Sequence, residues 1–338
     1  MFRVSRLGPL CHSLVVTALV TAGTAYADSQ VIPGTGQLVN TDDFEDTNWN
    51  FTFNWPKSSK EEDENIRYPL GQSSNRMWFE SPKRGIPDVV KRVDTPTGGI
   101  AGSKGSLLIR TRDCGVPNAP GHKQAQDDII MAAKPMSVSY TPSFTVRVYL
   151  PEWSQWEQRL GVTFGIRMGL QGPRTKEEAV GFGKFFNRTR TVTETEPYYP
   201  GFFIQFCPKT EPSNPLKKDF ALLLLRSDGM GHEIIGPRIF ETGWWTFGMT
   251  VTPDGRCHYY ASPGVDDLKE KDYITSAMPY NIPAQTFNTI FFNVCSPDNA
   301  QTWSTPWIID DPKVFYIQGS GSPLQTAKAA QNNGNMEF

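Results

Sequence analysis

Short apolar runs recur along this chain, and in many of them polar and apolar residues alternate. Each run is five to eight residues long and is bounded by Gly, Pro, Asn or Asp, as β-strands usually are. Apolar residues spaced three and four apart, the pattern of an amphipathic helix, are nearly missing. The sequence therefore predicts an all-β protein. The runs that carry this prediction are 106–111, 144–149, 161–168, 202–206, 220–226, 245–251, 257–261 and 289–294.

The segments between these runs predict a hairpin, two long loops and a tail. Asp254-Gly255 joins two apolar runs, and this dipeptide favours a tight hairpin turn. Segments 57–64 and 170–195 have the composition of long loops, and residues 319–338 are small and polar, as in a disordered tail. No internal repeat is evident, so we expect residues 28–318 to form a single domain.

Residues 1–27 have the pattern of a secretory signal peptide. Arg3 and Arg6 are followed by an apolar stretch at 14–20, and small residues at 25 and 27 predict cleavage near Ala27. The apolar stretch is too short for a membrane span, which needs about 20 residues. We therefore expect a secreted protein, extracellular or periplasmic, with no membrane span.

The charge of the chain argues against nucleic acid as a partner. Loss of residues 1–27 removes two arginines and no acid, which changes the net charge from −2 to −4. No basic stripe remains to neutralise a phosphate backbone.

Four cysteines follow residue 27, and none is spaced as a zinc-binding pair. An even number in an exported protein permits two disulfides with three alternative pairings, and buried free thiols are the other alternative. These cysteines are Cys114, Cys207, Cys257 and Cys295.

Two segments at opposite ends of the chain combine an apolar strand with acidic residues at its edge. They are Asp42–Asp46 with Trp49, and Trp307–Phe315. This pair resembles the first and last strands of concanavalin-like jelly-roll sandwiches, the fold of lectins, glucanases and many carbohydrate-binding modules. The resemblance implies an antiparallel concanavalin-like jelly-roll β-sandwich whose terminal strands lie together, and it implies a polysaccharide partner.

The same resemblance implies a structural calcium ion. In those proteins acids of the two terminal strands often bind Ca²⁺, and the matching residues here are Glu45 and Asp310. Asp43 and Asp311 should point to the other side of their strands, because side chains alternate. A charged edge strand without a metal is the alternative. No organic cofactor is expected.

The acidic residues do not match the pattern of a glycoside hydrolase of this fold. Retaining hydrolysis needs two carboxyl groups about 5 Å apart, which the glucanases place on one strand as E-x-D-x-(x)-E. The nearest match is Glu194-Thr195-Glu196, which lies among threonines before Pro197 and reads as a loop.

Elimination fits the residue inventory better. Alginate-lyase-like sandwiches, which the chain resembles in part, use a Tyr or His base with an Arg or Gln that neutralises the uronate carboxylate. Gln205 is followed by Phe206-Cys207 where those lyases have a histidine, and their tyrosine motif has no counterpart here. The alternative is that Arg110 and Arg112 are ordinary outward-facing strand residues and that His258 is a hydrogen-bonded structural histidine. The candidate catalytic residues are Arg110, Gln205, His258, Tyr260 and His122.

Exposed aromatic rings are a third route to sugar recognition. Most of the tryptophans should pack in the core, because aromatic side chains dominate core energetics. Trp153, Trp156 and Tyr199, with Arg112, are the residues that we expect to contact substrate.

We therefore expect a secreted, monomeric protein that recognises a polysaccharide and that degrades it, if it is an enzyme, by lyase-type elimination in preference to hydrolysis. A non-catalytic carbohydrate-binding protein and a structural or adhesive surface protein are the alternatives.

Overall fold

The computed structural model describes residues 31–54, 70–82, 84–112, 125–180, 188–297 and 301–318. Among them, no helix is long and apolar enough to cross a membrane. The sequence predictions for residues 1–27, 57–64 and 319–338, and those for Cys114 and His122, lie outside the described residues.

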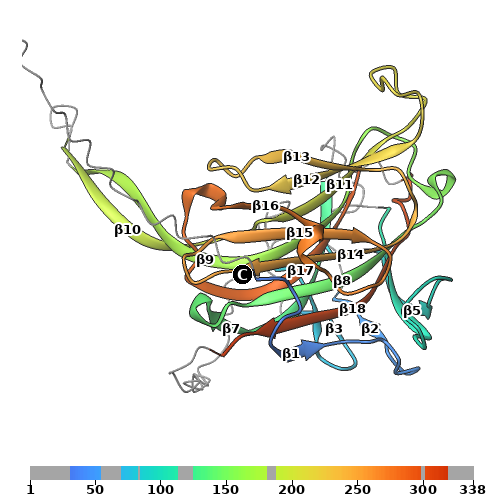
Figure 1. Cartoon of the computed structure of the whole chain (residues 1–338), viewed down its shortest axis with the longest axis horizontal. Coiled ribbons are helices and arrows are strands. Elements are labelled where there is room, and N and C mark those ends of the chain that lie inside the picture. Colours follow the sequence, from blue (N-terminus) through green and yellow to red (C-terminus); the bar gives the residue numbers. More distant parts are fainter. Residues whose placement is uncertain are drawn as a thin grey trace, which may run out of the picture.

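Two antiparallel sheets form the body of the protein (Figure 1). One has eight strands in the order β16-β15-β14-β8-β18-β6-β5, with β1 paired to β18. Its strands are β1 (Gln37–Thr41), β5 (Val89–Asp94), β6 (Gly105–Arg110), β8 (Ser143–Leu150), β14 (Gly243–Val251), β15 (Cys257–Pro263), β16 (Tyr273–Ala277) and β18 (Trp307–Tyr316).

The second sheet has ten strands in the order β13-β12-β11-β9-β17-β7-β4-β3-β2, with β10 paired to β9. Its strands are β2 (Phe51–Thr52), β3 (Gln72–Ser73), β4 (Trp78–Glu80), β7 (Ala125–Ser137), β9 (Gly161–Val180), β10 (Arg188–Tyr198), β11 (Gly201–Cys207), β12 (Phe220–Arg226), β13 (Glu233–Ile239) and β17 (Thr286–Ser296). Within the described ranges, helical structure is limited to the 3-10 turns η1 (Val138–Tyr140), η2 (Trp153–Gln155), η3 (Glu270–Asp272) and η4 (Pro279–Asn281).

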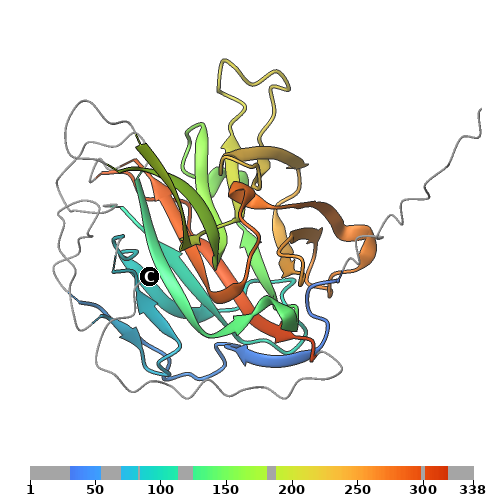
Figure 2. The same cartoon turned by 90° about the vertical axis from the view of Figure 1, so that its left-hand side faces the viewer.

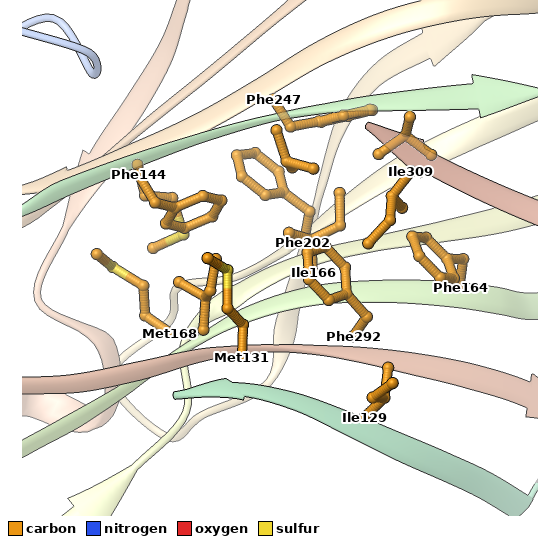
Figure 3. Close-up of a cluster of buried hydrophobic side chains, with 14 of the residues drawn as sticks. Ile129, Met131, Phe144, Phe164, Ile166, Met168, Phe202, Phe247, Phe292 and Ile309 are labelled. Carbon is orange, nitrogen blue, oxygen red and sulfur yellow. The ribbon is translucent and has the colours of Figure 1, made fainter. Parts of the chain in front are cut away.

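The core lies between the two sheets and follows from the alternation of each strand. Phe144 and Phe247 of the eight-stranded sheet meet Phe164, Phe202 and Phe292 of the ten-stranded sheet (Figure 3). Every second residue of these strands therefore faces the core and the others face outward. The predicted all-β antiparallel sandwich is confirmed.

The turn and the chain ends also agree with the sequence. β14 and β15 pair from Val251 and Cys257 outward, and Gly255 has a φ of +84° in the turn between them. β1 pairs with β18, so the first and last strands lie side by side (Figure 2).

The prediction of a long loop at 170–195 is wrong. β9 and β10 form a hairpin that projects from the body as an arm (Figure 1). Cross-strand ion pairs join Arg174 to Glu196 and Arg190 to Glu178, and Lys176 also pairs with Glu196. The arm has little apolar surface to bury, so its strands lack the apolar alternation from which the other strands were predicted.

The three described cysteines are buried free thiols. Cys207, Cys257 and Cys295 form no disulfide among the described residues, which favours the free-thiol alternative for these three. Burial raises the pKa of the Cys295 thiol to about 12, so it stays protonated and unreactive at neutral pH.

Candidate functional site

A pocket of about 330 Å³ opens on the outer face of the ten-stranded sheet. Strands β7, β9, β12 and β17 contribute to it, together with η4 and the segment between β4 and β5. The polar groups that line it include Arg84, Asp128, Arg167, Tyr199, Arg226 and Tyr280.

The alternation that builds the core also directs these side chains outward. On β9, Ile166 and Met168 face the core, so Arg167 between them faces the pocket. On β7, Ile129 and Met131 face the core and flank positions that point the other way. Asp128 reaches the pocket for that reason.

Arg167 is a buried cation held by several partners. Its Nε and Nη2 donate to the carbonyl oxygen of Tyr199 at 3.0 and 2.9 Å. The guanidinium lies 5.5 Å from the Tyr199 ring centre, 5.4 Å from that of Phe203 and 5.2 Å from that of Phe291. Burial, with the positive charge of Arg226 adding to it, lowers the pKa of Arg167 to about 10, so it remains charged at neutral pH.

Asp128 is a buried acid whose environment favours the neutral form. Its Oδ1 accepts from Asn293 Nδ2 at 2.6 Å and from Gln126 Nε2 at 3.0 Å. Burial raises the pKa of Asp128, and the positive charges of Arg84 and Arg167 oppose that rise only in part.

A glycine gives these groups the space they occupy. A Cβ on Gly165 would lie 2.6 Å from Asn293 Oδ1 and 2.8 Å from the Phe203 ring. Gly165 therefore allows Asn293 to reach Asp128 and lets the Phe203 ring lie under Arg167.

The outer side of the pocket carries a second cation and two phenols. Arg226 is paired with Glu233 on β13, with Nε donating to Oε1 at 2.9 Å, and lies 4.9 Å from the Phe203 ring centre. Tyr199 meets Phe291 edge-to-face at 5.5 Å, and Tyr280 meets Tyr198 at 5.7 Å.

The predicted catalytic residues are not brought together. Gln205 lies on the outer face of the ten-stranded sheet, outside the described lining of the pocket. Arg110, His258 and Tyr260 belong to the eight-stranded sheet, where their strand neighbours Ile109, Cys257 and Tyr259 face the core. They therefore point away from the core on the opposite side of the sandwich from Gln205.

His258 and Tyr260 are both fully buried, which favours the structural alternative for His258. His258 is fully buried, and its Nε2 lies 2.9 Å from the Thr252 hydroxyl. Tyr260 is also fully buried against Tyr273 at 5.4 Å, and burial raises the pKa of Tyr260 to about 12.

The predicted substrate contacts lie in different environments. Tyr199 lines the pocket. Trp156 is only 2% exposed and packs against Trp307, so its predicted exposure is wrong, and Trp153 stacks on Phe206 at 5.7 Å. Arg112 lies with Arg110 against Trp303, at 5.7 and 5.0 Å from its ring centre.

The sequence reasoning missed Asp128, Arg167, Arg226 and Tyr280. A usable signal existed for Arg167, because it is the charged residue within the apolar run 161–168. An unpaired charge at such a position has to lie on an outer face or bind a partner. Which outer face it reaches depends on strand order, which the run does not encode.

Glu45 and Asp310 do approach each other. Asp310 Oδ2 accepts from Ser103 Oγ at 2.8 Å, and Glu45 Oε1 accepts from the backbone N–H groups of Lys104 and Gly105. Burial raises the pKa of Asp310 to about 7, and the negative charges of Asp311 and Glu45 add to the rise. The described residues contain no group of three or more His, Cys, Asp or Glu that could hold a metal.

Asp311, the next residue of β18, is held by two cations. It pairs with Arg147 at 3.1 Å and with Lys313 at 2.7 Å, and its φ is +50° at an irregularity of β18. Asp310 pairs in register with Arg147, which Asp311 also contacts, so strict alternation does not hold across this irregularity and the predicted placement of Asp311 on the opposite side is wrong.

No protein-family model matches the chain, and a comparison with curated proteins finds no match. Solved structures similar to it include a carbohydrate esterase from the Shiga toxin-encoding bacteriophage phi24B, with a TM-score of 0.40 and 9% identity over 72% of this chain and 92% of that one. An alginate lyase from Pseudomonas aeruginosa gives 0.33 and 8% over 68% and 86%. A GH131 β-glucanase catalytic domain from Podospora anserina gives 0.34 and 10% over 71% and 86%. At these values the similarities assign no activity to the chain.

Proposed function

We propose that the pocket on the ten-stranded sheet binds an acidic polysaccharide through a uronate carboxylate and cleaves it by β-elimination. The observation that carries this proposal is the charge of the pocket. In the part of the lining that the structure describes, three arginines surround a single carboxyl, that of Asp128, which its environment shifts toward the neutral form. Arg226 is offset by Glu233, whereas Arg167 forms no ion pair with another described residue and supplies a positive charge for an anionic ligand.

The lining groups suit elimination better than hydrolysis. Hydrolysis needs two carboxyl groups at the scissile bond, and the described lining of the pocket supplies only Asp128. Elimination needs a cation at the carboxylate and a base at C5, and the pocket offers guanidinium groups beside two phenols.

The step can be written with these residues. Arg167 and Arg226 neutralise the carboxylate, which makes the C5 proton acidic. Tyr280, as the phenolate, takes that proton, the C4–O bond breaks, and the leaving oxygen takes a proton from the Tyr199 hydroxyl. The products are an unsaturated uronate and a new chain end.

Non-catalytic binding is the second candidate. It is favoured by the way the pocket cations are already held, with Arg167 bonded to the Tyr199 carbonyl and Arg226 to Glu233. A structural or adhesive role would leave the pocket without a sugar ligand.

We also infer that Glu45 and Asp310 hold a structural Ca²⁺. Two carboxyl groups that share Ser103 as a neighbour, one with a raised pKa, are the oxygen donors that calcium prefers. The ion would offset the repulsion between the acids. Secretion after cleavage near Ala27 and a monomeric state remain predictions from the sequence.

The experiment is incubation of the purified protein with polygalacturonate, alginate, hyaluronate and the neutral glucan laminarin. The ultraviolet absorbance of unsaturated uronate and the number of reducing ends are followed together. Absorbance that rises with an acidic polymer, and that is lost in Tyr280→Phe, is the expected result. Reducing ends without absorbance would indicate hydrolysis. Retention in an affinity gel with neither signal would indicate binding alone.

A further inference from the structure

Tyr280 is held in the pocket by an unusual backbone. Its φ is +61° and that of Asn281 is +55°, so two consecutive residues other than glycine adopt the left-handed conformation. This conformation is unfavourable for L-residues and persists where the surroundings impose it, often at functional sites. The structure identifies those surroundings.

The turn 227–232, between β12 and β13, makes the contacts that impose it. The Asp228 carbonyl oxygen accepts from Tyr280 N at 2.8 Å and from Gly231 N at 3.2 Å. A Cβ on Gly231 would overlap the Tyr280 ring, and a Cβ on Gly229 would lie 2.6 Å from the Asn281 amide. Both glycines are therefore needed for the close approach of turn and ring.

Hydrogen bonds to the Asp228 carboxylate stabilise the turn itself. The Asp228 carboxylate accepts from Met230 N at 2.8 Å and from His232 N at 2.6 Å, and it lies 3.2 Å from His232 Nδ1. Desolvation would raise the pKa of Asp228, but these hydrogen bonds and the His232 charge outweigh it and lower that pKa. Arg226 and Glu233, which flank the turn, are paired with each other.

One short segment therefore places two pocket groups at once. Arg226 comes directly before the turn on β12, and Tyr280 is seated against the turn from a distant part of the chain. Tyr280 also interacts electrostatically with Arg167 of the same pocket.

We propose that the turn 227–232 is a positioning element, in which Gly231 seats the Tyr280 phenol beside Arg167 and Arg226 for contact with a bound uronate. This proposal rests on the proposed function of the pocket and adds how its phenol is set in place. Gly231 is a positioning residue, because it acts on the ligand only through Tyr280.

The test compares Gly231→Ala with Gly264→Ala. The two glycines have φ values of +84° and +90°, but an added Cβ on Gly264 meets nothing within 4 Å. Both substitutions place an alanine at a similar positive φ, so the backbone strain should lower stability to the same extent. Only Gly231→Ala displaces the Tyr280 ring. With polygalacturonate or alginate oligomers, Gly231→Ala should lower kcat about 100-fold with little change in KM, as expected when a reacting group is misplaced by about 1 Å.

Three further measurements keep the test decisive. In a Tyr280→Phe background, adding Gly231→Ala should lower kcat no further. If Gly231→Ala fails to fold, His232→Gln at the exposed brace of the turn should give a smaller loss of the same kind. If the wild type binds these oligomers without cleaving them, the same variants are compared by affinity.

Two outcomes would overturn the proposal, and they are distinguishable. If Gly231→Ala and His232→Gln both match Gly264→Ala while the wild type is active, the positioning role is wrong and the proposed function stands. If the wild type neither binds nor cleaves any of the acidic polymers, the proposed function is wrong, and the positioning role falls with it.

Discussion

The outer faces of the two sheets carry similar residue types and differ in what lies over them. On the ten-stranded sheet, Arg167 and Asp128 line an open pocket. On the eight-stranded sheet, His258 and Tyr260 are fully buried. At Gly248 of that sheet a Cβ would meet Leu268 at 2.5 Å and Pro33 at 2.8 Å, so segments from elsewhere in the chain cover this face. A polar residue on an outer face can therefore contact a ligand only where a pocket reaches it, and residue type alone does not tell the two faces apart.

The largest expected effect concerns Asp310 on the covered side, an acid that has no cationic partner among the described residues. The pKa of Asp310 is about 7 in the folded protein and near 3.8 when unfolded, so the folded state holds its proton more tightly. The contribution of Asp310 to stability is therefore greatest below about pH 4 and falls as pH rises toward 7, by up to about 4 kcal/mol. Asp310→Asn should remove this part of the pH dependence, measured by urea unfolding at several pH values without calcium.

The same two proteins also test whether calcium binds at Glu45 and Asp310. If Glu45 and Asp310 bind the ion, added Ca²⁺ should raise the wild-type Tm at pH 7 and leave that of Asp310→Asn unchanged. Equal responses of the two proteins would argue against the site.

His258→Ala should destabilise the covered face of the eight-stranded sheet without affecting the pocket. It removes the contact with Thr252 and leaves a cavity in a fully buried position, which should cost about 2–4 kcal/mol in the free energy of unfolding. Polymer affinity of the folded variant should equal that of the wild type. A lost affinity with unchanged stability would restore His258 as a ligand-binding residue.

A matched pair of glycines separates the two faces directly. Gly165→Ala crowds Asn293 and Phe203 in the pocket, and Gly248→Ala crowds Leu268 and Pro33 over the other sheet. Each should cost about 1–3 kcal/mol as overpacking, measured by thermal unfolding. Only Gly165→Ala should weaken polymer binding, and equal affinities would contradict the placement of the site.

The smallest effect is expected on the arm. The pair of Arg190 with Glu178 is exposed to solvent at both side chains, so Arg190→Ala should change stability by about 0.5 kcal/mol or less. A loss of several kcal/mol in the same unfolding assay would mean that the arm is held by contacts other than those described.

The difference between the two outer faces also shows which features could be predicted from the sequence. Alternation and turn chemistry are local, so the apolar runs were correctly predicted as strands and the Asp254-Gly255 hairpin was found. The site depends on which strands become neighbours, and Asp128 and Arg167 meet across β17, which lies more than 100 residues further along the chain. Gln205 and His258 were grouped by residue type, although pairing places them on opposite sides of the sandwich.

The predictions for the arm and for Trp156 were wrong for a related reason. Strands that bury no apolar face give no apolar alternation, so 170–195 resembled a loop. Trp156 follows a proline and a short turn, which suggested exposure, but its indole Nε1 donates to the Pro151 carbonyl at 2.7 Å inside the core.

The most direct test of the central claim compares Arg226→Gln with Arg110→Gln. Both arginines lie on outer faces. Arg226 lines the pocket of the ten-stranded sheet. Arg110 belongs to the eight-stranded sheet and donates to the Ser304 carbonyl. Binding of polygalacturonate and alginate oligomers is measured by titration calorimetry at two salt concentrations. Arg226→Gln should weaken binding of at least one about tenfold or more and reduce its salt dependence, while Arg110→Gln matches the wild type. Equal binding by the two variants, or a loss confined to Arg110→Gln, would contradict the placement of the site on the ten-stranded sheet.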